Sequence, residues 1–405
     1  MPSLDIDSQW FSYIASFPYF EFFCMRITFV LPDGGFSGGV RVAAIYAERL
    51  KQRGHDVSVV FAIDKPSRRK RLAQILRGEG WPKPVKRKPS YFDAIDVPYT
   101  VVKVGCDVTE ADVPDADVVI ATWWETAEWI AHWSPAKGAK AYFVQHHEVF
   151  DYLPIERVKA TYTLPFHKIV VSKWLVDLMK AEYGDTDTSL IFNSVDTQQF
   201  YAPPRGKQPV PTVGLMYAQA AWKGCKISFE AIAQVAQKMP NLRIVAFGSN
   251  EPAPELPLPA NTTFTYLPAQ QDIKDIYASC DVWLCGSLSE GFGLTVVEAM
   301  ACRCPVVSSE VGGPIDLIKS GVNGYLAPIG NAQKLAEGLE KVLTLSELQW
   351  QEMSDAAYQT VIQYSWDDAT DLFEAALCKA IERSRREDPD CQDPEPMLGL
   401  PISVL

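Results

Sequence analysis

Short apolar stretches alternate with amphipathic stretches along the chain, and this alternation predicts β-strands and α-helices in turn. Residues 26–31 (RITFVL) form the first apolar run, a glycine-rich turn follows, residues 40–53 have a helical pattern, and residues 57–62 are apolar again. Strand, turn, helix and strand in this order make a βαβ unit, which builds a parallel sheet.

The alternation stops at a proline-rich segment and then resumes. Residues 201–211 (YAPPRGKQPVP) have the composition of a linker. Strands follow at positions such as 212–217 and 281–285, with an amphipathic helix near the end of the pattern. A chain of 405 residues is long enough for two domains. We therefore predict an α/β protein with domains at 25–200 and 212–365.

Both ends of the chain differ from this pattern. Residues 1–24 are rich in aromatic side chains and lack the charged start of a secretory signal, so we expect the first domain to begin at Met25. The segment is either an upstream extension, which we favour, or a stretch that dips into a membrane surface. A last helix is expected over 366–383, capped by Ser365, and the acidic, Pro-rich tail 384–405 is expected to be loose.

The composition argues against several functions. A net charge of −12 disfavours a general nucleic-acid binder. No apolar run approaches the roughly 20 residues that span a bilayer. Nine cysteines without a cleavable signal indicate reduced thiols in a cytoplasmic protein. Cys302 and Cys304 form C-x-C without a second ligand pair, so a zinc site is not expected.

One segment is strongly basic in this acidic chain. Residues 65–88 contain a dense cluster of lysines and arginines. The segment is either a solvated surface or a patch that attracts anionic lipid head groups or a pyrophosphate-linked acceptor, and the sequence leaves both interpretations open.

The strongest candidate chemistry lies in residues 289–305, SEGFGLTVVEAMACRCP. Glycines let the backbone approach a ligand closely, and free N–H groups at the start of the following helix favour an anion. Glu290 and Glu298 lie eight residues apart, too far to touch the same ligand atom. The arrangement suits a long ligand, with one carboxylate at each end and a phosphate between them.

The segment EGFGLTVVEAMA resembles the donor-site signature of the group 4 retaining glycosyltransferases. Members of that family have the GT-B fold, in which two Rossmann-like domains face each other across a cleft and a C-terminal helix crosses back to the first domain. The resemblance implies that Glu298 binds the ribose of a nucleotide sugar and that Glu290 lies beside the transferred sugar. It also implies that the backbone N–H groups of Phe292, Gly293 and Leu294 bind the diphosphate.

Two further matches extend the resemblance. Lys223-Gly224 matches a Lys-Gly pair whose ammonium group neutralises the leaving diphosphate, although an arginine that often precedes this pair is missing here. Gly38 and Gly39 match, by position, a glycine-rich loop of the first domain that lies over the diphosphate.

A histidine pair follows an expected strand at 141–145. In the resembled family, a histidine at this strand end touches the donor sugar near its reactive carbon. His146 aligns best and His147 is the alternative, because the family more often has a single histidine followed by aspartate. Tryptophans 123, 124 and 129 follow another expected strand, and they either line an acceptor sugar or, as we slightly favour, pack within a helix.

The resemblance implies metal-independent, retaining transfer of a hexosyl residue from a nucleotide-diphosphate sugar to a glycan or lipid-linked acceptor, without a cofactor. His146, Glu290 and Lys223 are the expected catalytic residues. Polysaccharide or glycolipid assembly in the cytoplasm is the expected setting, with residues 65–88 as the candidate contact to the inner face of a membrane.

Two alternatives belong to other functional classes. Residues 35–39 spell G-x-S-x-G, with Ser37 in the nucleophile position of an α/β-hydrolase. That match lies after the first strand and leaves the 290–298 segment unexplained. The second alternative is a non-catalytic module that binds nucleotide sugars.

Overall fold

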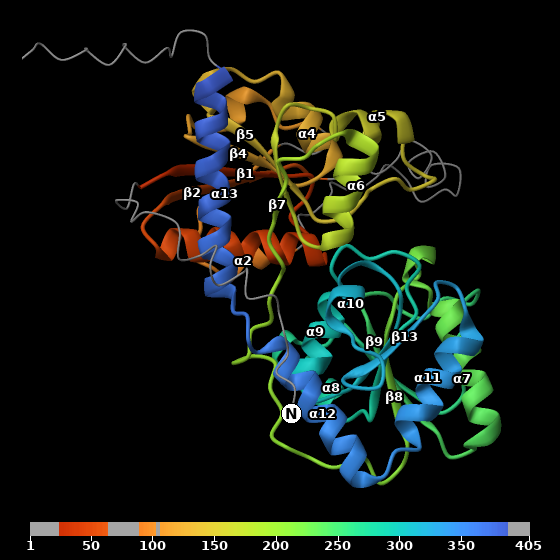
Figure 1. The fold of residues 1–405 in the computed structure, drawn as a ribbon. Coiled ribbons are helices and arrows are strands. Elements are labelled where there is room, and N and C mark those ends of the chain that lie inside the picture. Colours follow the sequence, from red (N-terminus) through yellow and green to blue (C-terminus); the bar gives the residue numbers. More distant parts are fainter. Residues whose placement is uncertain (1–23, 64–88, 103–105, 388–405) are drawn as a thin grey trace, which may run out of the picture.

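The computed structural model describes residues 24–63, 89–102 and 106–387, which fold into two α/β domains (Figure 1). The expected architecture of two Rossmann-like domains is confirmed. The N-terminal extension up to residue 23, the basic segment 65–88 and the tail beyond residue 387 lie outside the described residues. Within the described ranges, no helix combines the length and the apolar character needed to cross a membrane.

The first domain contains a seven-stranded parallel sheet in the order β3-β2-β1-β4-β5-β6-β7. Its strands are β1 (Arg26–Leu31), β2 (Asp56–Phe61), β3 (Tyr99–Val101), β4 (Val118–Ala121), β5 (Ala139–Val144), β6 (His167–Val170) and β7 (Ser189–Leu190). Every residue of β1 after Arg26 is buried. Helices cover both faces of such a sheet, which explains why its central strands are continuous apolar runs.

The second domain repeats this plan with a six-stranded parallel sheet in the order β10-β9-β8-β11-β12-β13. Its strands are β8 (Thr212–Tyr217), β9 (Arg243–Gly248), β10 (Thr262–Tyr266), β11 (Val282–Cys285), β12 (Val306–Ser309) and β13 (Gly324–Ala327). In each sheet the strand order reverses beside the first strand, between β1 and β4 and between β8 and β11. Open α/β sheets bind ligands at the carboxyl ends of the strands at this point.

The helices pack on the two sheets and join them. Those of the first domain are α2 (Gly38–Gln52), α4 (Trp124–Ala131), α5 (Ile155–Thr161) and α6 (Lys173–Tyr183). Those that follow are α7 (Cys225–Lys238), α8 (Ile273–Ala278), α9 (Leu294–Ala301), α10 (Gly312–Leu317), α11 (Ala332–Leu343), α12 (Glu347–Val361) and α13 (Trp366–Glu387). Short 3₁₀ turns are η1 (Tyr91–Asp93), η2 (Glu110–Asp112), η3 (Pro135–Lys137), η4 (Ala221–Lys223) and η5 (Gln270–Asp272).

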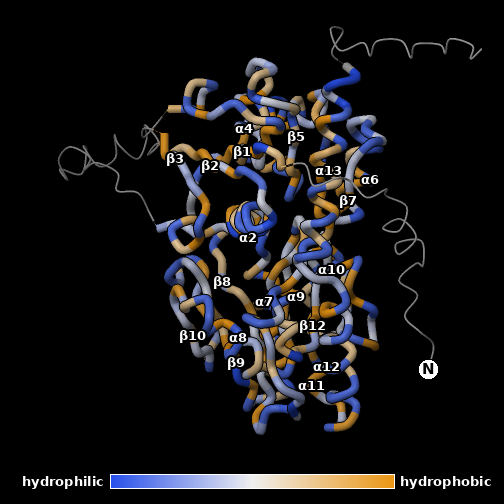
Figure 2. Tube along the Cα trace, turned by 90° about the vertical axis from the view of Figure 1, so that its left-hand side faces the viewer, coloured by the Kyte–Doolittle hydropathy of each residue, from blue (hydrophilic) through white to orange (hydrophobic). Residues whose placement is uncertain are grey.

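Helix α2 lies where the first domain meets the second (Figures 1 and 2). It begins at Gly38, two residues earlier than predicted, because the Ser37 hydroxyl accepts a hydrogen bond from the N–H of Val40 over 3.3 Å. This is the ordinary role of serine at a helix start. The cap points the glycine-bearing first turn of α2 toward the second domain.

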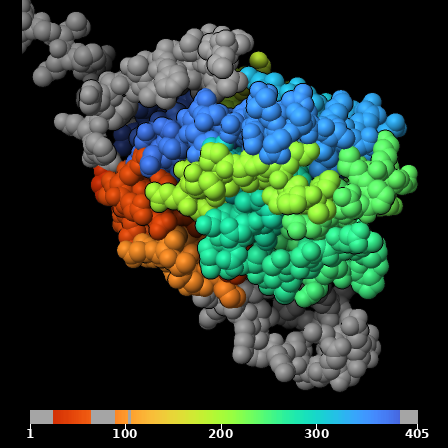
Figure 3. All heavy atoms as spheres, turned by 90° about the horizontal axis from the view of Figure 1, so that it is seen from below, coloured from red at the N-terminus to blue at the C-terminus, as the bar shows by residue number. Residues whose placement is uncertain are grey.

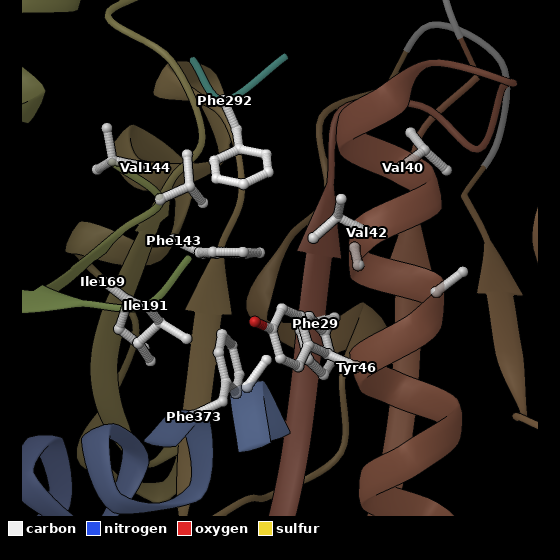
Figure 4. Packing of buried hydrophobic residues seen from close by; sticks show 14 of the residues in the cluster. Phe29, Val40, Val42, Tyr46, Phe143, Val144, Ile169, Ile191, Phe292 and Phe373 are labelled. Carbon is white, nitrogen blue, oxygen red and sulfur yellow. The ribbon is translucent and has the colours of Figure 1, made fainter. Parts of the chain in front are cut away.

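Helix α13 returns from the second domain and packs on the first. Its Phe373 stacks on Tyr46 of α2 with ring centroids 4.1 Å apart, and it meets Phe143 of β5 edge-on at 5.2 Å (Figure 4). Ser365 caps the helix, since its hydroxyl accepts a hydrogen bond from the N–H of Asp368 over 3.1 Å. The helix runs four residues further than the predicted end at Arg383.

The linker at 201–211 is bound to the second domain along its length. Arg205 donates a hydrogen bond to the carbonyl of Cys280 over 2.5 Å and lies over the ring of Trp350. Lys207 donates to the carbonyl of Leu343 over 2.7 Å. Viewed from below, the yellow-green segment near residue 200 runs between the blue C-terminal helices and the teal part of the second domain (Figure 3).

The start of helix α6 corrects one sequence-based expectation. Ser172 precedes the helix, as predicted, but its hydroxyl is buried without a hydrogen-bond partner and caps no N–H group of the helix. Instead the N–H of Lys173 donates to the carboxylate of Asp316, in α10 of the second domain, over 3.1 Å. The cap therefore comes from across the cleft, where a local sequence pattern cannot reveal it.

We expect Phe373→Ala to lower the free energy of unfolding by about 3–5 kcal/mol, because it removes a ring buried between α13 and the first sheet. Urea unfolding followed by circular dichroism measures the change. Leu348→Ala is the control, since Leu348 is exposed and should change stability by less than about 0.5 kcal/mol. A loss below about 1 kcal/mol in Phe373→Ala would contradict the anchoring role of α13.

Candidate active site

The predicted site residues follow the strands that flank the points of reversal. Gly38 and Gly39 come after β1, Lys223 after β8 and Glu290 after β11, while His146 follows β5. Because the carboxyl ends of both sheets face the same cleft, residues far apart in the sequence meet there. The structure places all of the predicted residues at the junction of the two domains.

The centre of the site is an ion pair between Lys223 and Glu290. The ammonium group donates to both carboxylate oxygens, over 2.8 and 2.9 Å, and the Ser287 hydroxyl donates to one of them over 2.7 Å. Both charged side chains are largely buried. Burial alone would lower the pKa of Lys223, but the Glu290 carboxylate outweighs it and holds that pKa above its ordinary value. The lysine is therefore a fixed cation.

A close approach of two turns brings this pair together. Gly224 has φ of 60°, and a Cβ atom at this position would lie 1.8 Å from the carbonyl oxygen of Gly286. Only glycine allows this combination of a left-handed backbone and contact with the turn after β11. The Lys-Gly pair of the sequence thus sets the position of the lysine next to Glu290.

Helix α9 begins directly beside the ion pair. The N–H groups of Phe292, Gly293 and Leu294 donate no hydrogen bond within the part of the chain that the structure describes. Gly293 has φ of 90°, which turns the loop into the helix. Unpaired N–H groups and the positive end of the helix dipole favour an anion at this point.

Glu298 lies one to two turns into α9, where two side chains hold its carboxylate. Tyr277 donates to one oxygen over 2.8 Å, and Arg41 of α2 pairs with the other. The Glu298 side chain is only 4% exposed. Neither Arg41 nor Tyr277 is predicted from the sequence, because their contacts with Glu298 join distant parts of the chain.

The two adjacent histidines point to different neighbours. His146 Nδ1 donates to the carbonyl of His147 over 2.8 Å, so its Nε2 accepts from the Ser289 hydroxyl of the second domain over 3.0 Å. His147 Nε2 instead lies 2.7 Å from the Tyr183 hydroxyl within the first domain. His146 is thus the histidine that contacts the loop of the predicted donor site. Ser289, which holds it, was not identified from the sequence.

The glycines of the first domain lie opposite the start of α9. A Cβ atom at Gly38 would approach the Leu294 side chain at 3.5 Å, and the Gly39 carbonyl accepts a hydrogen bond from Gln145 over 3.0 Å. A Cβ atom at Gly291 would lie 1.7 Å from the Gln145 carbonyl. The two domains therefore touch across the predicted donor site, and glycines permit the contact.

Other sequence candidates have structural roles. Ser37 caps α2, and Trp124 is buried in the core of the first domain, with Trp123 and Trp129 packed against that core. Within the described ranges, no group of three or more His, Cys, Asp or Glu residues is arranged to hold a metal ion. Two segments of the sequence, 115–117 and 185–187, have the pattern Asp-x-Asp, which resembles a metal-binding motif. Their carboxylates pair with cationic side chains, as in the 2.8 Å pair of Asp117 with Arg26.

Comparison with known proteins identifies the second domain. Residues 200–360 match the family model described as glycosyl transferases group 1. The second domain belongs to this family. The resemblance inferred from the 290–298 segment is thereby confirmed for the domain that carries it, and we refer to these residues as the group 1 glycosyltransferase domain.

Relatives with known names match part of the chain. D-inositol 3-phosphate glycosyltransferase from Mycobacterium leprae is 32% identical over 165 residues, which cover 38% of this chain and 39% of that protein. The protein of the same name from Mycobacterium tuberculosis is 30% identical over 175 residues, covering 39% of this chain and 36% of the relative. The chain thus matches about two fifths of the length of these relatives.

Solved structures extend the likeness to the whole fold. HepE from Anabaena, crystallised with UDP and glucose, superposes with a TM-score of 0.68 at 18% identity, covering 88% of this chain and all of that one. Sucrose-phosphate synthase from Thermosynechococcus elongatus gives 0.67 at 15% identity, covering 89% of this chain and all of the other. The group 1 glycosyltransferase domain therefore faces a second Rossmann-like domain in a GT-B fold.

We expect His146 to stay neutral at neutral pH, because burial lowers its pKa below the ordinary 6.5. The nearby Glu290 carboxylate opposes this effect, and the Lys223 ammonium group reinforces it. NMR titration of the imidazole should give a midpoint below pH 6.5, with His146→Gln identifying its signal among the five histidines. A midpoint at or above 6.5 would contradict the buried, neutral imidazole.

Proposed function

We propose that the protein is a retaining glycosyltransferase that moves a hexosyl residue from a nucleotide-diphosphate sugar to a glycan or lipid-linked acceptor. The observation that carries the proposal is the Lys223–Glu290 pair at the start of α9, where unpaired N–H groups and a fixed cation converge. This arrangement suits a diphosphate with a sugar attached to it. HepE, which shares the fold, is crystallised with UDP and glucose, and this supports a donor of the same class.

The donor would lie along α9. Glu298 would accept hydrogen bonds from the ribose hydroxyls, and the N–H groups of Phe292, Gly293 and Leu294 would bind the diphosphate. Lys223 has three N–H donors, of which two already serve Glu290. The third remains for a phosphate oxygen, so the lysine can hold the carboxylate and the leaving group together.

Catalysis follows from where charge develops. As the bond to the anomeric carbon breaks, negative charge grows on the diphosphate, where the ammonium group and the backbone donors stabilise it without a metal ion. Each preorganised donor of this kind contributes about 3 kcal/mol to the transition state. Glu290 and the neutral His146 would hold the sugar hydroxyls near the developing positive charge.

The configuration at the anomeric carbon is retained if the acceptor hydroxyl approaches from the side of the leaving group. The departing diphosphate would then take up the acceptor proton, and the new bond forms on the face that the old bond leaves. Water must be kept out for transfer to outcompete hydrolysis. The contact of His146 with Ser289 across the cleft supports a site that closes around its substrates.

Donor entry would require the domains to separate. Arg41 pairs with Glu298, and Trp174 donates to the Gly291 carbonyl over 3.1 Å, so the first domain covers the segment to which the donor would bind. Opening about the 201–211 linker would release Glu298 for the ribose. Arg41 would then be free to remain beside the carboxylate or to turn toward the phosphates.

The acceptor and the cellular setting complete the proposal. We infer a glycan or glycolipid acceptor, polysaccharide or glycolipid assembly as the process, and a cytoplasmic location. Membrane contact through residues 65–88 rests on their positive charge alone, since they lie outside the described part of the chain.

A thermal-shift screen of UDP-, GDP-, ADP- and dTDP-sugars tests the proposal, because a ligand that binds the folded state raises the melting temperature. We expect a clear shift with the sugars of one base, and full activity with that donor in the presence of a chelator. A hydrolase that uses Ser37 would instead be labelled by a fluorophosphonate, and no shift with any nucleotide sugar would contradict the proposal.

Lys223→Ala and Glu290→Gln should each lower turnover about a hundredfold, since each removes a preorganised group next to the leaving diphosphate. Release of nucleoside diphosphate from the donor selected by the screen measures this. Lys226→Ala is the matched control, because Lys226 is exposed in the first turn of α7 and should leave turnover unchanged. Turnover near that of the wild type in Lys223→Ala would remove the lysine from the mechanism.

Glu298→Ala should weaken binding of the nucleoside diphosphate about ten- to a hundredfold, the effect of losing hydrogen bonds to a buried carboxylate. Calorimetry measures the affinity, and Glu352→Ala on the exposed side of α12 is the control. Glu298→Ala also leaves the Arg41 guanidinium without its partner. Measuring the affinity of Arg41→Ala in parallel shows how much of the lost affinity comes from breaking this pair and how much from removing the carboxylate. An unchanged affinity in Glu298→Ala would contradict the ribose assignment.

A further inference from the structure

Three aromatic side chains meet at the junction of the domains, outside the donor positions assigned above. Phe150 and Tyr152 lie in the loop between β5 and α5, and Trp222 lies in η4 of the second domain. The Phe150 and Tyr152 rings are 5.5 Å apart at an angle of 7°, and Trp222 lies 4.7 Å from Phe150 and 6.0 Å from Tyr152. We call Phe150, Tyr152 and Trp222 the aromatic platform.

The aromatic platform borders the groups that would hold the transferred sugar. The His146 ring stacks on Phe150 with centroids 5.2 Å apart. Trp222 directly precedes Lys223, and its carbonyl accepts a hydrogen bond from the N–H of Leu288 over 2.7 Å. The platform is therefore linked to the histidine on one side and to the ion pair on the other.

Exposure distinguishes Tyr152 from the aromatic residues of the core. Tyr152 is 64% exposed although it stacks on two rings, and Leu288, which is hydrogen-bonded to Trp222, is 38% exposed. Aromatic residues at the centre of the core are fully buried, as Tyr46 and Phe373 are. A largely exposed, stacked ring next to a catalytic site offers a flat apolar face to a ligand.

We propose that the aromatic platform is the acceptor subsite and that it binds a pyranose ring of a saccharide acceptor by stacking. The C–H bonds on one face of a pyranose carry partial positive charge, and they match the negative face of an aromatic ring. This assignment rests on the proposed glycosyltransferase function and names the acceptor as a sugar rather than a lipid chain. Because both domains contribute rings, the subsite is complete only when the cleft is closed.

Saturation-transfer NMR tests the proposal with methyl glycosides of glucose, galactose, mannose and N-acetylglucosamine as probes. The sample contains the protein together with the nucleoside diphosphate that binds it most tightly. We expect saturation of at least one glycoside, strongest on the ring protons of one face. Tyr152→Ala should lower this signal at least fivefold, and Tyr152→Phe should keep it, because stacking needs the ring and not the hydroxyl group.

Tyr266→Ala is the matched control, since Tyr266 is 46% exposed on β10 and is not part of the aromatic platform. Its signal should equal that of the wild type. Tyr152 is exposed, so its removal should leave the melting temperature nearly unchanged. The proposal is overturned if the wild type transfers saturation to no glycoside, or if Tyr152→Ala keeps the full signal. It is also overturned if 1-octanol, rather than a glycoside, receives saturation from the wild type and loses this signal in Tyr152→Ala.

Binding measurements with the donor distinguish a failure of this proposal from a failure of the proposed function. They also show whether the platform binds the donor sugar instead of the acceptor. Tyr152→Ala should bind both the nucleoside diphosphate and the intact nucleotide sugar with the affinity of the wild type, as measured by calorimetry. Weaker binding of the nucleotide sugar, with unchanged binding of the nucleoside diphosphate, would assign the platform to the donor sugar and overturn the acceptor assignment. Loss of nucleotide binding in the wild type would instead be a failure of the proposed function.

Discussion

The ion pair between Lys223 and Glu290 is the interaction on which the site depends. It fixes the turn after β8 against the turn after β11, and the Gly224 backbone makes that approach possible. A buried ion pair adds little to the stability of a protein, because the cost of desolvating both charges offsets much of their attraction. Under the proposed function, their position beside the unpaired N–H groups of α9 makes Lys223 a fixed cation next to the diphosphate.

The first domain completes the site from the other side of the cleft. Arg41, His146 and Trp174 each contact the group 1 glycosyltransferase domain at a predicted donor position. The apolar core is also continuous across the junction, with Phe292 of the second domain directed toward Phe143 and Val144 of the first (Figure 4). Closure therefore assembles the site, and substrate entry has to oppose these contacts.

Much of the fold, and the grouping of the residues predicted for the donor site, followed from local sequence. Buried parallel strands are short apolar runs, and the 290–298 segment concentrates glycines and carboxylates within one turn and one helix. Contacts between distant residues have no such signal. Ser289 and Arg41 have no distinctive sequence context, and Asp316 caps a helix of the other domain. The rings that stack beside the site are Phe150, Tyr152 and Trp222, of which Tyr152 is exposed, rather than the tryptophans at 123–129.

Hydrogen–deuterium exchange of the segment 286–301 tests the central claim most directly, because that claim assigns the diphosphate to main-chain N–H groups. The protein is compared with and without the nucleoside diphosphate that gives the largest thermal shift. The account predicts slower exchange in this segment, which contains the N–H groups of Phe292, Gly293 and Leu294. Unchanged exchange there, with protection elsewhere in the chain, would contradict it.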